Sequence, residues 1–209
     1  MSELSQWKPD DFIAGRVALD FANTMDNWLD PAKHRRLVET PEQLYDWLVY
    51  AGTLDRDEAK WCFEVDKVRG HGDRGLVIAA HALQDHIHTV FQDFAYRREP
   101  DPRCVSAIYE SLARAVLHVK TGDIDPCTCN YLFEVLIDRP EGVLYPIAAS
   151  AARLLLGEDK ANIKECGGCG WLFLDQSKNK RRRWCEMKTC GNRAKARRFY
   201  QARKASEAA

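Results

Sequence analysis

The sequence predicts a mainly α-helical protein with a small β-hairpin or sheet (α+β), followed by a short cysteine-rich part. Three observations lead to this prediction. Apolar residues recur at helical spacing through most of the first 160 residues, patterns typical of strands are short and few, and four cysteines stand in two close pairs in the last quarter of the chain.

Five helices are expected before residue 160, at residues 41–51, 56–68, 76–97, 101–117 and 145–156. The first begins with Pro41 behind Thr40, which is a typical helix start with a capping side chain. Two strands, at 118–121 and 131–137, are expected to pair across the turn-rich stretch between them. Gly157 ends the last helix, and we place a domain boundary in the polar stretch that follows it.

The four cysteines have the spacing Cys166-x2-Cys169, fifteen residues, Cys185-x4-Cys190. Two close pairs of thiolates can surround one tetrahedral zinc ion, and four sulfur ligands leave no open position, so the site is expected to be structural, with one Zn²⁺ per chain. The alternative is two disulfides. We favour zinc, because the sequence shows no signal peptide and no apolar run of transmembrane length, which predicts a cytoplasmic protein with reduced thiols.

Between the pairs, residues 170–184 are expected to form a β-hairpin, with Trp171 and Phe173 in its first strand and residues 181–184 in its second. A helix at 191–205 would follow Cys190. This order of a knuckle, a hairpin and a helix predicts a treble-clef-like zinc finger. Ala196 and Phe199 are expected to pack against the hairpin, and Arg193, Arg197, Tyr200 and Lys204 to share another face.

The charges separate along the chain. Residues 164–209 hold 13 Lys and Arg against 4 Asp and Glu, whereas residues 1–163 hold 18 against 27. A solvated charged face would mix both signs, so the basic end predicts a phosphate-backbone partner, and the acidic part is expected to dock on it and mask it. Arg182 should point away from its two neighbours. The candidate nucleic-acid contacts are Arg181, Arg182, Arg183, Arg193, Lys195, Arg197, Arg198 and Lys204.

Two groups of polar residues before residue 160 invite a functional interpretation. His81, Asp85 and His88 share one helical face, although we favour a surface role because no further metal ligand is evident. Asp20, Asn23 and Thr24 stand among apolar neighbours and need partners if buried. We favour partners within the fold; if a small-molecule ligand binds, these three residues and Arg16 are the candidates for contacting it.

The finger motifs also resemble a known family. Residues 171–175, Arg182-Arg183-Trp184-Cys185 and Cys190-Gly191-Asn192-Arg193 resemble the CGNR zinc finger, and residues 18–24, with Trp47 and Ala51-Gly52, are similar to the start of the ABATE domain that precedes it in many bacterial proteins. The resemblance covers essentially the whole chain. It implies an ABATE-like domain over residues 1–160, a CGNR-type finger over 161–209, the four cysteines as zinc ligands, and a stress-induced transcription regulator.

The leading functional prediction is a transcription regulator that binds DNA through the finger, with residues 1–160 sensing a ligand or forming a homodimer. The alternative is an adaptor that binds RNA or protein through the same finger. We do not expect an enzyme, because the sequence has no nucleophile elbow, phosphate-binding glycine loop or paired catalytic carboxylates. No membrane partner is expected.

Overall fold

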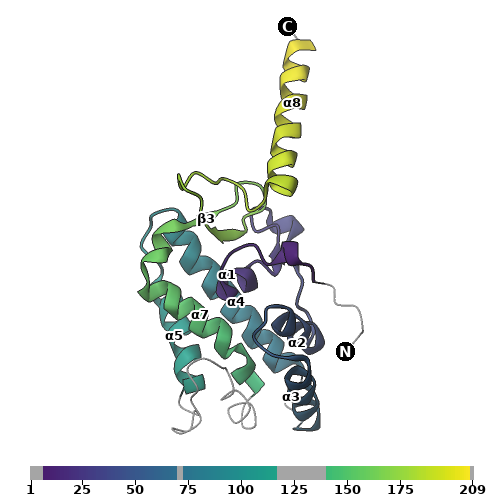
Figure 1. Ribbon diagram of the computed structural model, residues 1–209, viewed down its shortest axis with the longest axis vertical. Coiled ribbons are helices and arrows are strands. Elements are labelled where there is room, and N and C mark those ends of the chain that lie inside the picture. Colours follow the sequence, from purple (N-terminus) through teal and green to yellow (C-terminus); the bar gives the residue numbers. More distant parts are fainter. Residues whose placement is uncertain (1–6, 70–72, 117–139, 208–209) are drawn as a thin grey trace.

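The computed structural model of the protein describes residues 7–69, 73–116 and 140–207. Helices form a body below, and the finger lies on its upper end, with the last helix projecting away from it (Figure 1). We use "body" for residues 1–160 and "finger" for residues 161–209. The predicted strands at 118–121 and 131–137 lie outside the described residues.

The predicted helices of the body are present, with small differences at their ends. The longer helices of the body are α2 (Pro41–Tyr50), α3 (Arg56–Arg69), α4 (Asp73–Ala95), α5 (Pro102–Val116) and α7 (Tyr145–Leu156). Thr40 caps α2 as expected, because its hydroxyl accepts a hydrogen bond from the Gln43 backbone N–H. No helix among the described residues is long and apolar enough to cross a membrane.

Helix α4 is the centre of the body. Its residues Ile87 and Phe91 are fully buried, and it contacts α1 (Val17–Ala22), α2, α5 and the finger. Phe21 of α1 meets Trp47 of α2 edge to face, with ring centroids 5.0 Å apart. Short 3₁₀ helices at Pro9–Asp11, Pro31–Lys33, Pro140–Leu144 and Glu158–Asn162 connect these elements.

Two small antiparallel sheets complete the fold. In the body, β1 (Met25–Asp26) pairs with β2 (Arg35–Arg36). In the finger, β3 (Ile163–Glu165) pairs with β4 (Leu172–Leu174), with Lys164 opposite Phe173. The predicted hairpin was therefore wrong in its second strand. Residues 181–184 form no strand, and the hairpin instead encloses the first cysteine pair.

The finger strands share the hydrophobic core of the body. Leu172, Phe173 and Leu174 of β4 are buried in the same apolar cluster as Leu19 and Phe21 of α1. The outer edge of β4 is also covered, since the Leu174 N–H donates to the Ala14 carbonyl at 2.9 Å. The finger is therefore packed against the body through apolar and backbone contacts rather than held by charge attraction.

Helix α8 (Asn192–Glu207) differs most from expectation. It follows a turn of π-helix at Met187–Gly191, contains no buried residue, and projects from the rest of the chain (Figure 1). The prediction that Ala196 and Phe199 pack on the hairpin was wrong, because the Phe199 side chain is 67% exposed. The prediction that the acidic body masks the basic helix was also wrong for the described residues. Helical periodicity alone does not say whether an apolar face has a partner.

Candidate metal centre and nucleic-acid interface

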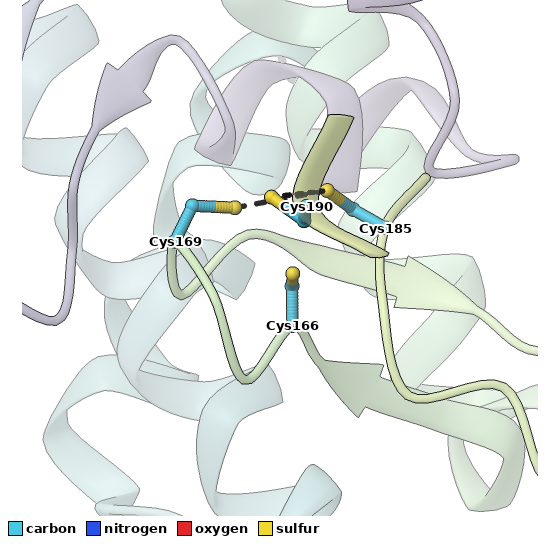
Figure 2. Close-up of side chains that lie close together, drawn as sticks. All are labelled: Cys166, Cys169, Cys185 and Cys190. Carbon is cyan, nitrogen blue, oxygen red and sulfur yellow. Dashed lines mark hydrogen bonds between the residues drawn. The ribbon is translucent and has the colours of Figure 1, made fainter. Parts of the chain in front are cut away.

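The four cysteines of the finger converge on one point (Figure 2). Cys166 and Cys169 lie in the turn between β3 and β4, Cys185 follows in an irregular segment, and Cys190 belongs to the π-helical turn before α8. Their sulfur atoms all lie within 4.8 Å of one another. Three of the four side chains are buried, and Cys169 is half-buried.

This geometry fits a tetrahedral metal. With zinc–sulfur bonds of about 2.3 Å, the sulfurs of a ZnS₄ centre lie about 3.8 Å apart. The Cys169 and Cys185 sulfurs are 3.7 Å apart, and those of Cys185 and Cys190 are 3.6 Å apart. No disulfide joins these cysteines. The donor set and its spacing thus match zinc better than the alternative of two disulfides.

The pKa shifts of the clustered thiols also favour a bound metal cation. The neighbouring Cys169 and Cys185 thiols hold the pKa of Cys166 well below its usual range, because they stabilise its thiolate. The same contacts raise the pKa of Cys169 and Cys185. One thiolate therefore forms easily, whereas additional thiolates would repel it. A divalent cation at the centre removes this repulsion.

Backbone hydrogen bonds hold the first cysteine pair in its turn. The Cys166 N–H donates to the Trp171 carbonyl at 2.8 Å, and the Gly170 N–H donates to the Cys166 carbonyl at 2.9 Å. The Gly168 N–H points at the Cys166 sulfur at 3.4 Å. The Gly168 N–H favours the thiolate form of Cys166 that a metal requires.

Arg193 supports the cluster from α8. Its Nη2 donates to the Cys190 sulfur at 3.1 Å, and this contact raises the pKa of Arg193. The positive charge lies beside a sulfur that carries negative charge when metal-bound, so Arg193 stabilises the ligand form of Cys190. Its placement among the nucleic-acid contacts stays a prediction, and the structure adds this role at the cluster.

Asp175 orders the turn after β4. Its side chain is fully buried, and its Oδ1 accepts hydrogen bonds from the Ser177 N–H at 3.0 Å and hydroxyl at 2.6 Å, while Oδ2 accepts from the Arg182 N–H at 3.0 Å. Lys164 forms an ion pair with Oδ2 at 2.9 Å. Although burial alone would raise the pKa of Asp175, these contacts lower it to about 2.

The turn places three arginines in two different settings. Arg182 lies over the Phe173 ring at 4.5 Å, and its Nε donates to the Trp184 carbonyl at 2.9 Å, so it faces inward. The strand alternation from which its orientation was predicted is absent, because residues 181–184 form no strand. Arg183 and Arg181 are exposed, with the Arg183 guanidinium 5.5 Å from the centre of the Trp184 ring. Of the three, Arg182 is committed to the fold, and the other two present their charges to solvent.

Helix α8 presents the remaining basic side chains. Lys195, Arg197, Arg198 and Lys204 are exposed, as are Phe199 and Tyr200, whose side chains are each 67% exposed. Arg203 pairs with Glu207 at 2.7 Å one turn later. Within the part of the chain that the structure describes, no hydrogen bond or ion pair joins the first four to another side chain.

The candidate ligand residues near the start of the body have partners within the fold. The Asn23 side chain bonds both the N–H and the carbonyl of Leu172, the Thr24 hydroxyl donates to the Phe21 carbonyl and accepts from Gln84, and an Asp20 oxygen accepts from the Ala14 N–H. Arg16 pairs with Asp159. These bonds support the interpretation that the polar atoms of these residues find their hydrogen-bond partners within the fold. A contact with a small-molecule ligand stays a prediction.

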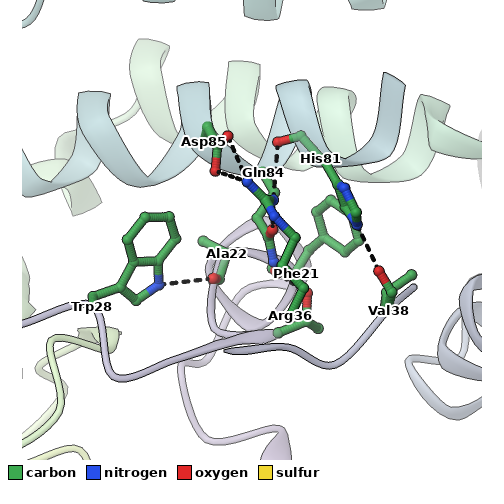
Figure 3. Close-up of polar contacts among 9 residues, drawn as sticks. Phe21, Ala22, Trp28, Arg36, Val38, His81, Gln84 and Asp85 are labelled. Carbon is green, nitrogen blue, oxygen red and sulfur yellow. Dashed lines mark hydrogen bonds and ion pairs between the residues drawn. The ribbon is translucent and has the colours of Figure 1, made fainter. Parts of the chain in front are cut away.

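The three polar residues on α4 do not meet at one point. Figure 3 shows that His81 reaches the Val38 carbonyl at 2.6 Å, while Asp85 forms an ion pair with Arg36 at 2.7 Å. His88 is buried, and its Nε2 lies 3.1 Å from the Gly170 carbonyl of the finger. The three side chains thus join α4 to three other parts of the chain and do not meet at a metal site. The predicted surface role was wrong for His88, which is buried.

The sequence did not predict the contacts around His88, which join the body to the finger. Trp28 stacks on His88 with centroids 3.6 Å apart, and Trp171 Nε1 donates to the Met25 carbonyl at 3.0 Å. Gly170 adopts a φ of +81°, and a Cβ there would lie 2.6 Å from the Trp28 Cβ. The sequence offered one sign of this close packing, the glycine directly after Cys169, because glycine adopts a positive φ without steric cost and lets other chain segments approach closely.

The fold and the site together define a helical body joined to a four-cysteine finger. A protein-family model described as "Putative stress-induced transcription regulator" (ABATE) matches residues 15–158, and the CGNR zinc finger model matches residues 162–204. The chain therefore belongs to the ABATE family and carries a CGNR zinc finger. No curated protein matches it.

Proposed function

We propose that this protein is a DNA-binding transcription regulator, not an enzyme, whose finger holds one structural zinc ion and binds duplex DNA through α8. The observation that carries the proposal is the combination of the cysteine cluster with a basic helix that buries no residue and starts at Asn192, just after the last cysteine. Bound zinc would supply only a rigid crosslink, since four sulfur ligands leave no position for a substrate.

The shape of α8 favours duplex DNA. Sixteen helical residues span about 24 Å, and the major groove of B-DNA is about 12 Å wide, enough for one α-helix. The major groove of an RNA duplex is too narrow for side chains to read. Beyond Arg193, which contacts the cysteine cluster, α8 buries no residue and is available to enter a groove.

The composition of α8 fits the same partner. Lys195, Arg197, Arg198 and Lys204 provide cations for phosphates, and Tyr200 offers a ring and a hydroxyl beside them. Helices of this length that pack on nothing are only marginally stable in water. DNA binding would therefore both neutralise the charge and stabilise the helix.

The body is proposed to sense a ligand or to form a homodimer. A single finger reads few base pairs, so a dimer that places two fingers on one site would give the specificity that a regulator needs. Sedimentation of the free and DNA-bound protein measures this directly: a dimer is expected on DNA, and one chain per duplex would remove this part of the proposal.

The test of DNA binding compares duplex DNA with duplex RNA of the same length, using fluorescence anisotropy and zinc-loaded protein. We expect tighter binding to DNA, loss of binding after chelation of zinc, and recovery when zinc is returned. Tighter binding to RNA would favour the adaptor alternative. Binding to neither would contradict the proposed function.

A further inference from the structure

A basic cleft lies between the body and the finger, outside α8. Its volume is about 390 Å³, and its charged lining consists of Arg97, Lys164, Glu165, Arg181, Arg182 and Arg183. Arg97 follows the C-terminal end of α4, and residues 181–183 belong to the ordered turn of the finger. Two parts of the chain that are far apart in sequence thus contribute cations to one cleft.

The acidic residue of the cleft is already engaged. Glu165 accepts hydrogen bonds from Gln92 Nε2 at 2.7 Å and from the Tyr96 hydroxyl at 3.3 Å, and burial raises the pKa of its carboxyl. Lys164 and Arg182 are held by Asp175 and by Phe173, as described above. Among the described residues, Arg97 and Arg181 have no hydrogen-bond or ion-pair partner for their side chains, so the cleft keeps unpaired positive charge.

The backbone at Arg97 is unusual for an arginine. The Arg97 N–H donates to the Phe94 carbonyl and the Arg98 N–H to the Asp93 carbonyl, which is the hydrogen-bond pattern of a Schellman motif. Arg97 occupies its left-handed position with φ +59°, where glycine is the favoured residue. An arginine here costs conformational free energy, which points to a use for its side chain.

We propose that this cleft binds a backbone phosphate of the DNA, so that the body contacts the nucleic acid directly through Arg97. Arg97 and Arg181 line the same cleft, and a guanidinium group pairs with phosphate oxygens in a forked geometry. The segment at 181–183 leads within nine residues to α8, and both are fixed to the same cysteine cluster. A duplex held by α8 and a phosphate held in the cleft would then share one rigid support.

This inference rests on the proposed function and adds a second contact to it. A favourable helix-end charge is another reason for a cation at Arg97, because the C-terminal end of α4 carries partial negative charge. The variant Arg97→Gly distinguishes a structural role of Arg97 at the helix end from a role in phosphate binding. Arg97→Gly relieves the left-handed backbone and removes the charge, so a purely structural role changes only stability.

The test measures binding of the zinc-loaded full chain to a DNA duplex at several salt concentrations, together with thermal unfolding. Arg97→Gly should melt at or above the wild-type temperature, bind roughly three- to tenfold more weakly, and make the negative slope of log K against log salt less steep by about 0.9. Lys60→Ala removes one exposed cation on α3 and should change neither the affinity nor the slope.

If Arg97→Gly keeps the wild-type affinity and slope, phosphate binding in the cleft is contradicted, while DNA binding by α8 is unaffected. No binding by the wild-type protein would instead defeat the proposed function, and the cleft with it. Combining Arg97→Gly with Arg181→Ala gives a further check: if both arginines hold one phosphate, the double variant should lose less affinity than the product of the single losses.

Discussion

The side chain of Asn23 pairs with the backbone of Leu172 as a neighbouring strand would. Its Oδ1 accepts from the Leu172 N–H and its Nδ2 donates to the Leu172 carbonyl, both at 2.8 Å. Asn23 ends α1 in the body, and Leu172 begins β4 in the finger. One buried amide therefore joins the body to the strand that follows the first cysteine pair.

Asn23→Ala should lower the free energy of unfolding by about 3 kcal/mol, because it leaves a buried donor and a buried acceptor without partners. Urea unfolding of the zinc-loaded protein measures this. Asn179→Ala, at an exposed position in the finger, should change stability by less than about 0.5 kcal/mol. Equal stability of the two variants would show that Asn23 does not hold the finger to the body.

Gly170 and Gly52 give a matched pair of glycines. Both have positive φ, +81° and +69°, but a Cβ at Gly170 would meet Trp28 at 2.6 Å, whereas one at Gly52 would meet nothing within 4 Å. Both alanine variants should lose roughly 1 kcal/mol to the left-handed backbone. Gly170→Ala should lose about 2 kcal/mol more through overpacking. Similar unfolding midpoints in urea would argue against close packing of Trp28 on the finger.

His88 should make stability depend on pH. Burial lowers the pKa of His88 to about 4 from its ordinary 6.5, so the neutral ring is the form that donates to Gly170. The contribution of neutral His88 to the free energy of unfolding is complete above pH 6.5. It is lost as the pH falls towards 4, by about 3 kcal/mol in total.

The variant His88→Gln isolates this effect, since Gln retains an N–H donor and does not titrate. Burial raises the pKa of Asp20 to about 7, which reduces stability as the pH rises from about 4 to 7, but both proteins share this contribution. The difference in unfolding free energy between wild type and variant should therefore shrink on acidification. A constant difference between pH 7.5 and 5 would contradict the buried neutral histidine.

Arg193 and Arg197 should separate zinc binding from DNA binding. Arg193→Ala removes the donor to the Cys190 sulfur and should weaken zinc affinity about 10- to 100-fold in competition with a chelator. Arg197 lies one turn further along α8 and its side chain is exposed, so Arg197→Ala should leave zinc affinity unchanged. Equal zinc affinities would assign Arg193 to the nucleic-acid surface alone.

The sequence allowed most helices and the cysteine cluster to be predicted, for local reasons. Thr40 and Pro41 mark a helix start by their own chemistry, and close cysteine pairs converge wherever turns form. The strand partner of β4 and the surroundings of α8 depend on contacts between distant segments, which periodicity does not contain. Asn23 shows the same limit: its polarity among apolar neighbours was visible, but its partner, Leu172, was not.

The most direct measurement of the central claim is the salt dependence of DNA binding for a variant of α8. Arg197→Ala combined with Lys204→Ala removes two exposed cations from the helix. The negative slope of log K against log salt should become less steep by about 1.8, with weaker binding at every salt concentration. Zinc content should remain at the wild-type value. An unchanged slope and affinity in this variant would contradict DNA binding through α8.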